Sequence, residues 1–121
     1  MAAGPASLVD LLRESARSFT DRQAILLRGA AVSYGELWQG VCRAANALRA
    51  GGLAPGERVA LLIENSPEYV MAYYAVLQAG GVAVGLNTAM RGAELVRNVA
   101  HCAANALIAM PGHPELPALM A

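Results

Sequence analysis

Two short polar segments each follow an apolar run that is typical of a buried strand. Asn65-Ser66 follows residues 59–63, and Asn87 follows residues 82–86. In open α/β sheets, ligands bind at the carboxyl ends of the strands, so these amide and hydroxyl groups are suitably placed to contact a substrate. We therefore take Asn65, Ser66 and Asn87 as candidate substrate-binding residues. A structural interpretation stands beside this one, because Ser and Asn also cap helices at strand-to-helix turns.

The other side chains that could do chemistry form no pattern of catalysis or metal binding. His101, Cys102 and His113 match no zinc-ligand spacing, and we expect the two histidines to be solvated or half-buried. Gly80-Gly81 follows a helical pattern and precedes a strand, which is the reverse of a dinucleotide fingerprint. The chain has no lysine, which excludes a GxxxxGK[ST] phosphate loop. The sequence therefore predicts no catalytic, cofactor-binding or metal-binding residue.

The charge balance argues against a nucleic-acid or anionic-membrane partner. Nine arginines and nine carboxylates give the 121-residue chain a formal net charge of zero, whereas such surfaces normally carry a basic excess. No apolar run approaches the ~20 residues of a membrane-spanning helix. Cys42 and Cys102 are predicted to be buried, reduced thiols. Together with a first segment that does not resemble a secretory leader, they predict a cytoplasmic protein.

Strand and helix signals alternate along the chain and predict an α/β fold. Residues 59–63 and 82–86 are continuously apolar, as in strands that are buried on both faces of a parallel sheet, and residues 106–109 form a weaker third strand. Right-handed crossovers would place helices on both faces of this partial, doubly wound, mostly parallel sheet. Before it, residues 24–32 predict a short β-hairpin that turns at residues 28–30.

Serines mark the starts of the predicted helices. Ser7 and Ser66 each precede a helical pattern, and Ser33 with Glu36 forms a capping box. A further helix, at residues 91–101, is expected to direct three residues inward: Leu95, Val96 and Val99.

The helix predicted at residues 67–79 is apolar nearly all the way round. Such a helix is either buried on most sides or covered by another part of the protein. Residues 114–121 predict the start of another helix without a stop signal. We therefore expect residues 1–121 to be a single compact unit that is a fragment of a larger domain.

Several motifs occur in a defined order from about residue 8 to residue 109. They are Ser33-Tyr34-Gly35-Glu36-Leu37, Gly52-Leu53-Ala54-Pro55-Gly56-Glu57-Arg58-Val59, Asn65-Ser66-Pro67-Glu68, Ala79-Gly80, Leu86-Asn87-Thr88 and Glu94-Leu95. No single motif is specific, but their order and spacing resemble the first part of the adenylate-forming (AMP-binding) acyl-CoA synthetases. Thr88 and Arg91 depart from the family pattern, which usually has proline and a helix-capping serine there. Leu86-Asn87 is closer to the acyl- or aryl-CoA ligase branch than to peptide-synthetase domains.

The resemblance implies the N-terminal part of the large domain of a ligase. Such enzymes use ATP and magnesium to convert a small carboxylic acid into an acyl-adenylate and pass the acyl group to CoA, here as a fatty-acid or other carboxylic-acid ligase. The family's phosphate loop, its Tyr-Gly-x-Thr-Glu segment and its late lysine do not occur in these residues, and electrostatic stabilisation depends on such groups. We expect this chain alone to be inactive and its partner to be the remainder of its own polypeptide.

Two alternatives belong to other functional classes. A stand-alone, non-catalytic interaction module would dock a partner chain on the apolar helix at residues 67–79. A small flavodoxin-like domain would bind a nucleotide by itself, but no Ser/Thr/Gly phosphate loop follows the first strand. A fragment with an unpaired edge strand is also expected to self-associate as a homodimer.

Overall fold

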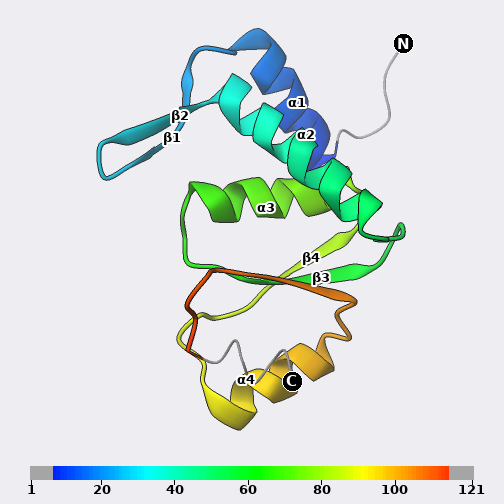
Figure 1. Cartoon of the computed structure of the whole chain (residues 1–121). Coiled ribbons are helices and arrows are strands. Elements are labelled where there is room, and N and C mark those ends of the chain that lie inside the picture. The colour runs from blue at the N-terminus through cyan, green and yellow to red at the C-terminus, as the bar shows by residue number, and fades with distance from the viewer. Residues whose placement is uncertain (1–6, 115–121) are drawn as a thin grey trace.

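Alternating strands and helices build a layered α/β fold in this computed structural model, which describes residues 7–114. The elements, in chain order, are α1 (Leu8–Ser18), β1 (Gln23–Leu27), β2 (Ala30–Ser33), α2 (Tyr34–Ala50), β3 (Arg58–Leu62), α3 (Pro67–Gln78), β4 (Val82–Gly85), α4 (Gly92–His101) and β5 (Ala106–Ala109). Figure 1 shows α1 and α2 stacked over α3, with a sheet beneath α3 and α4 on the far side of that sheet.

β3 is the centre of a three-stranded parallel sheet with the order β4-β3-β5. Val59 pairs with Ala83 on one side and with Ala106 on the other. All four residues from Val59 to Leu62 are fully buried, which confirms the prediction of a strand covered on both faces. After β3 the chain forms β4 on one side of it and then crosses to form β5 on the other side, as at the start of a doubly wound sheet.

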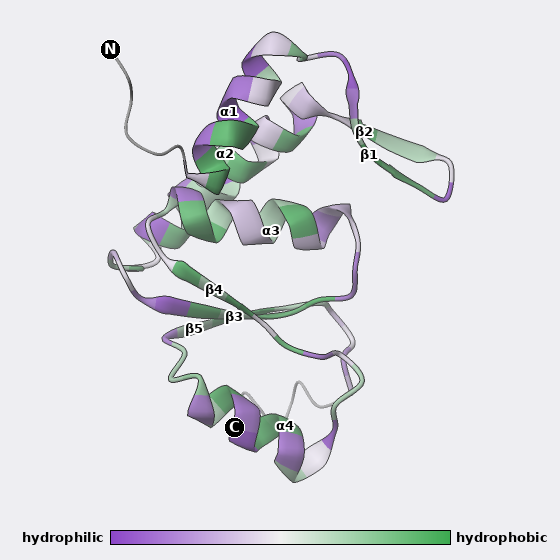
Figure 2. Ribbon diagram, turned by 180° about the vertical axis from the view of Figure 1, so that it is seen from behind, coloured by the Kyte–Doolittle hydropathy of each residue, from purple (hydrophilic) through white to green (hydrophobic). Residues whose placement is uncertain are grey.

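α3 is buried because it lies between two layers of the same chain. One side packs on the sheet, where Ala72 and Val76 join Val59 and Leu61 in a hydrophobic cluster. The opposite side, including Met71, packs against a second cluster whose buried members are Leu12, Leu37 and Val41. Figure 2 shows that α2, α3 and the strands of the sheet, which lie one above another, all carry apolar (green) segments. The nearly all-round apolar pattern is therefore satisfied within the chain, which removes the reason to regard α3 as a docking surface.

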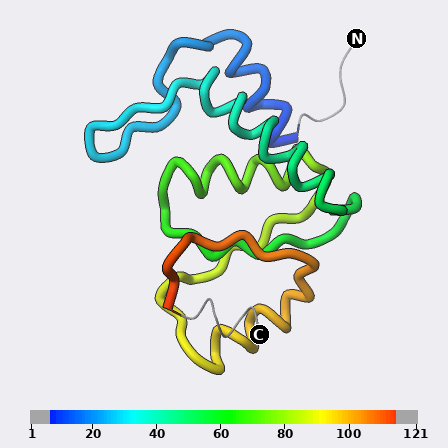
Figure 3. The backbone as a smooth tube through the Cα atoms, viewed as in Figure 1, coloured from blue at the N-terminus to red at the C-terminus, as the bar shows by residue number. Residues whose placement is uncertain are grey.

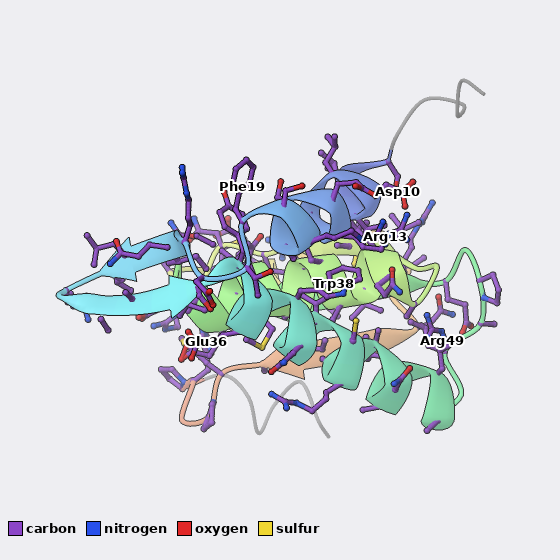
Figure 4. All side chains as sticks on the ribbon, turned by 90° about the horizontal axis from the view of Figure 1, so that it is seen from above. Asp10, Arg13, Phe19, Glu36, Trp38 and Arg49 are labelled. Atoms are coloured by element: carbon purple, nitrogen blue, oxygen red, sulfur yellow. The ribbon has the colours of Figure 1, made fainter. Side chains whose placement is uncertain are left out.

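The α1–α2 layer is held over α3 by packing and by a hydrogen bond from α2 to the end of α3. Figure 4, seen from above, shows the two helices side by side with Trp38 labelled between them, and Trp38 packs on the second cluster. Within α1, Arg13 forms an ion pair with Asp10 at 2.8 Å. At the far end of α2, Arg49 Nη2 donates to the Gln78 carbonyl at 2.6 Å, which ties the last turn of α2 to the last turn of α3.

The helix starts have the predicted capping geometry. Ser33 Oγ accepts from the Glu36 amide at 3.1 Å, and Glu36 Oε1 accepts from the Ser33 amide at 3.0 Å. Ser7 and Asp10 form a second, equivalent capping box. The hydrogen bond from the Ser33 backbone, followed by that with its hydroxyl, lowers the pKa of Glu36, and the same two contacts with Ser7 lower the pKa of Asp10.

The β1–β2 hairpin projects from the helical layer (Figure 3) and has a tighter turn than predicted. Arg28 and Gly29 form a two-residue turn with φ values of 51° and 82°. Two positive φ values are typical of the turns that match strand twist in a two-residue hairpin. The prediction of a three-residue turn was therefore wrong, because Ala30 is already part of β2.

Other predictions of burial need correction. β4 is an edge strand rather than a buried strand, and its Val82 is 46% exposed. On α4, Leu95 is fully buried, but Val96 is 46% exposed because only one line of this helix faces the sheet. Cys42 and Cys102 are free thiols, as predicted, although both are half-buried rather than buried. The helix start predicted at residues 114–121 falls almost wholly outside the described residues.

No helix within residues 7–114 is both long and apolar enough to cross a membrane.

Candidate functional site at the carboxyl edge of the sheet

The loops that follow the three parallel strands meet at one edge of the sheet, which is the edge on which the candidate residues were predicted to lie. Because the strands are parallel, their carboxyl ends share this edge (Figure 1). The loop after β3 leads into α3, and the loop after β4 leads into α4. These two helices lie on opposite faces of the sheet, so the chain changes face between β3 and β5. In doubly wound folds, this switch point is where a ligand crevice forms.

The Ser66 hydroxyl uses both its donor and its acceptor in hydrogen bonds to the backbone. Its Oγ accepts from the Tyr69 amide at 3.2 Å and donates to the Glu64 carbonyl at 2.9 Å. Pro67 follows as the first residue of α3, where no amide donor is needed. The structure therefore places Ser66 as the helix cap.

Asn87 has a hydrogen-bond partner for its side chain, and Asn65 differs from it. Asn87 Oδ1 accepts from the Ala89 amide at 2.9 Å, which closes a local turn after β4. Asn65 is exposed in the β3–α3 loop, and no hydrogen bond of its side chain is found within residues 7–114. Asn65 is thus the candidate whose amide is available to a ligand.

A groove of about 410 Å³ lies at the switch point between β3 and β5. It is lined by Ile63, Glu64 and Ser66 after β3, by Glu68 and Ala72 on α3, and by Ile108, Ala109, Met110 and Pro111 at the end of β5. The structure thus brings Ser66 to the groove, whereas neither Asn65 nor Asn87 lines it. Its charged groups are carboxylates, which repel an anionic ligand such as a phosphate or a substrate carboxylate.

Tyr69 and Gly85 form a contact that the sequence interpretation missed. A Cβ placed on Gly85 would lie 2.7 Å from Tyr69 Oη, so the absence of a side chain at the end of β4 makes room for this hydroxyl. The Tyr69 ring also stacks on Tyr73, with ring centroids 6.4 Å apart. The only sequence signal was a glycine at the end of an apolar strand.

A second missed contact joins the loops after β4 and β5. His113 is 2% exposed, so the prediction of a solvated or half-buried histidine was wrong. Its Nε2 lies 3.0 Å from the Thr88 carbonyl oxygen and 3.3 Å from Arg91 Nη1. Arg91 Nη1 also donates to the Thr88 carbonyl. The two positions that depart from the family pattern therefore contact each other, and Arg91 precedes α4 without a side-chain cap.

The described part of this edge has exposed carboxylates and a hydroxyl that is bonded to the backbone. Within residues 7–114 no three His, Cys, Asp or Glu side chains lie close enough together to hold a metal ion. The carboxylates Glu64 and Glu68 are exposed, and the capping hydroxyl of Ser66 is engaged with the backbone. The arrangement can position a loop and shape an apolar groove.

Comparisons with known proteins agree with this architecture. A feruloyl-CoA synthase of Amycolatopsis sp. is 42% identical over 106 residues, covering 88% of this chain and 22% of the relative. A long-chain-fatty-acid–CoA ligase of Bacillus subtilis (strain 168) is 36% identical over 81 residues, which cover 67% of this chain and 14% of that ligase. The crystal structure of a benzoate CoA ligase from Burkholderia xenovorans LB400 has a TM-score of 0.78 at 31% identity, covering 84% of this chain and 21% of that one.

The chain therefore spans about a fifth of the length of the first of these relatives. Residues 12–120 match the family described as AMP-binding enzyme. This match covers most of the chain, and the TM-score of 0.78 shows that the fold described above is similar to that of the benzoate CoA ligase. By sequence and by fold, the chain belongs to the AMP-binding, adenylate-forming enzyme family.

Proposed function

We propose that the chain is the N-terminal scaffold of the large domain of an ATP-dependent acid–CoA ligase. The observation that carries the proposal is the family match over residues 12–120, together with 42% identity to a CoA synthase. The ligase would condense a carboxylic acid with ATP to an acyl-adenylate and then transfer the acyl group to CoA. ATP, magnesium and CoA are the cofactor and co-substrates that this proposal implies.

We further propose an aromatic carboxylic acid as the substrate class. The feruloyl-CoA synthase matches a longer part of the chain, and at higher identity, than the fatty-acid ligase does, and the structural relative named above acts on benzoate. A fatty acid is the second candidate, supported by the 36% identity to the long-chain ligase. The groove at the switch point does not distinguish the two classes, because its carboxylates disfavour either acid.

In this proposal, residues 1–121 do not catalyse adenylation by themselves. The chain has no lysine and only two threonines, so it cannot contain the family's Ser/Thr/Gly phosphate loop with its lysine, or the late lysine that would stabilise a transferring phosphoryl group. The catalytic groups would lie in the remainder of the polypeptide. A cytoplasmic location is part of the proposal, because Cys42 and Cys102 are both free thiols.

Carboxylate-dependent pyrophosphate exchange tests the proposal. The 121-residue chain and the product of the complete reading frame of its source gene would each be assayed with ferulate, benzoate and palmitate. We expect exchange with an aromatic acid from the complete product and none from the 121-residue chain. Exchange with palmitate alone would replace the aromatic class by the fatty-acid class. A complete product that is inactive with every acid would contradict the proposed ligase activity. An active 121-residue chain would contradict the proposal that the catalytic groups lie in the remainder of the polypeptide.

A further inference from the structure

The loop between β4 and α4 begins with a β-turn over residues 87–90. The Met90 amide donates to the Asn87 carbonyl at 3.1 Å, and Asn87 Oδ1 accepts from the Ala89 amide at 2.9 Å. Thr88 occupies the second position of this turn, where proline is common because its ring fixes φ. The Thr88 amide makes no hydrogen bond within residues 7–114, so the turn needs no donor there. The loop therefore lacks the residue that would restrict its second position most directly.

Two side chains hold the carbonyl of Thr88 instead. His113 Nε2 lies 3.0 Å from the Thr88 carbonyl oxygen, and because that oxygen can only accept, we assign the proton to Nε2. Arg91 Nη1 donates to the same carbonyl and to the Met90 carbonyl, the latter at 2.8 Å. The two nitrogens are 3.3 Å apart, as expected for two donors that share one acceptor. We call these contacts the Thr88 clamp, which joins the loop after β4 to the start of α4 and to the segment after β5.

Neither clamp residue is explained by the stability of its own segment. Arg91 directly precedes α4 and makes no side-chain capping bond, and a cation at a helix N-terminus is opposed by the helix dipole. His113 is 2% exposed and is the one polar or charged side chain that is buried within residues 7–114. Burying an imidazole costs free energy unless it is hydrogen-bonded. Both residues thus contact the loop after β4 from positions that are otherwise unfavourable for them.

We propose that Arg91 and His113 are positioning residues of the ligase, which hold the loop after β4 in one geometry for substrate binding. The inference rests on the proposed function, in which the carboxyl edge of the sheet faces the substrates. Asn87 is exposed at this edge, and the bond from the Ala89 amide fixes its Oδ1. The Asn87 Nδ2 donors make no hydrogen bond within residues 7–114, so they are left to an oxygen atom of a substrate.

The expected signature is a loss of substrate affinity without a loss of chemistry. If the loop samples several geometries, only a fraction of the molecules can bind, and the apparent dissociation constant rises by the inverse of that fraction. For the complete polypeptide, His113→Leu should raise KM for the acid, ATP or CoA about tenfold. Neither clamp residue touches a reacting atom in this proposal, so kcat should stay within about twofold. His113→Gln keeps a nitrogen donor near the position of Nε2 and should restore most of the affinity.

A proline at position 88 provides a test that a packing defect at position 113 does not mimic. Proline restricts the second position of the turn without the clamp, and the Thr88 amide has no hydrogen bond to lose. Thr88→Pro added to His113→Leu should therefore bring KM back to within about threefold of the starting protein. An equally raised KM in the double variant would overturn the inference, as would a His113→Gln variant that is no better than His113→Leu.

Hydrogen–deuterium exchange of the complete polypeptide measures the loop directly. Arg91→Ala should speed the exchange of the Ala89 and Met90 amides about tenfold, because the turn opens more often. Arg97→Ala is the matched control, since Arg97 is also exposed and its side chain makes no hydrogen bond or ion pair within residues 7–114. Both variants should shift the melting temperature by no more than about 4 °C. Equal exchange of the two amides in both variants would overturn the clamp.

Ligase activity, measured on the same samples, separates this inference from the proposed function. A complete polypeptide that activates no carboxylic acid, but whose Ala89 and Met90 amides exchange faster in Arg91→Ala, would support the clamp and remove the proposed activity. An active ligase whose loop exchange and KM values are unchanged in Arg91→Ala would keep the proposed function and overturn the clamp.

Discussion

The Tyr69 hydroxyl occupies the space that a side chain at position 85 would take, since a Cβ on Gly85 would approach Oη to 2.7 Å. The contact joins the first turns of α3 to the last residue of β4, 16 residues later in the chain. It fixes where β4 ends relative to α3, and with it the start of the loop that carries Asn87.

Gly85→Ala should destabilise the chain by about 1–3 kcal/mol, the usual cost of overpacking. Tyr69 cannot easily turn away, because its ring stacks on Tyr73. In a Tyr69→Phe background, the next ring atom lies 3.9 Å from the added Cβ, so the same substitution should cost much less. Thermal unfolding of the four proteins of this double-mutant cycle measures the coupling. Additive effects would show that the hydroxyl does not set the constraint.

Ser66→Ala should reduce stability by about 1 kcal/mol, because the Tyr69 amide loses its capping acceptor. Ser66→Asp keeps an acceptor at the cap and adds a favourable charge at the helix start, so it serves as the control. Chemical denaturation of the 121-residue chain measures both. If Ser66 acts only as a cap, the complete ligase carrying Ser66→Asp should keep its pyrophosphate exchange. Loss of exchange without loss of stability would show that Ser66 contacts substrate.

Leu95→Ala should destabilise the chain by about 2–5 kcal/mol, as expected for a leucine truncated in a core. Leu95 is fully buried and is the one buried residue of α4, so it is the main apolar anchor of that helix on the sheet. Val96→Ala is the matched control, because Val96 is 46% exposed and should change stability by no more than about 0.5 kcal/mol. Thermal melts compare the two. Equal losses would mean that α4 packs through a different face.

Glu36→Gln should make the free energy of unfolding depend less steeply on pH at acidic pH. The pKa of Glu36 is lowered in the folded chain, mainly by the hydrogen bond from the Ser33 amide. The unfolded chain therefore binds the proton more readily, so this contribution is fully present above the ordinary value of 4.5 and is lost as the pH falls through the lower, folded value. Denaturation midpoints measured from pH 6 down to about pH 2.5 test this. An unchanged slope in the variant would assign the acid sensitivity to other carboxylates, such as Asp10.

The features that were predicted well from sequence depend on residues that are close together in the chain. The capping box at Ser33 depends on residues three positions apart and formed as expected, and Ser7, which was expected to cap, also forms such a box with Asp10. The burial of β3 agreed with its uninterrupted apolar run, which is typical of a strand covered on both faces. The family motifs likewise lie at turns and caps, where local geometry restricts the residue type.

The features that sequence missed depend on contacts between distant residues. His113 is buried through a loop 22 to 25 residues earlier, and no local pattern marks it. Val82 lies in an apolar run like that of β3, but its strand has a neighbour on one side only. Asn87 was a reasonable ligand candidate from its place after a strand, yet its amide closes a local turn and does not line the groove.

The burial of α3 on two sides also affects how mutations in this protein would be interpreted. A helix between a sheet and a second helical layer has little surface on which substitutions are neutral. In a deep mutational scan of the complete ligase, α3 would lose function at nearly every position, as an active-site helix would. Parallel measurement of protein abundance would separate the two cases: α3 variants would lose abundance and activity together, whereas true catalytic variants would lose activity alone.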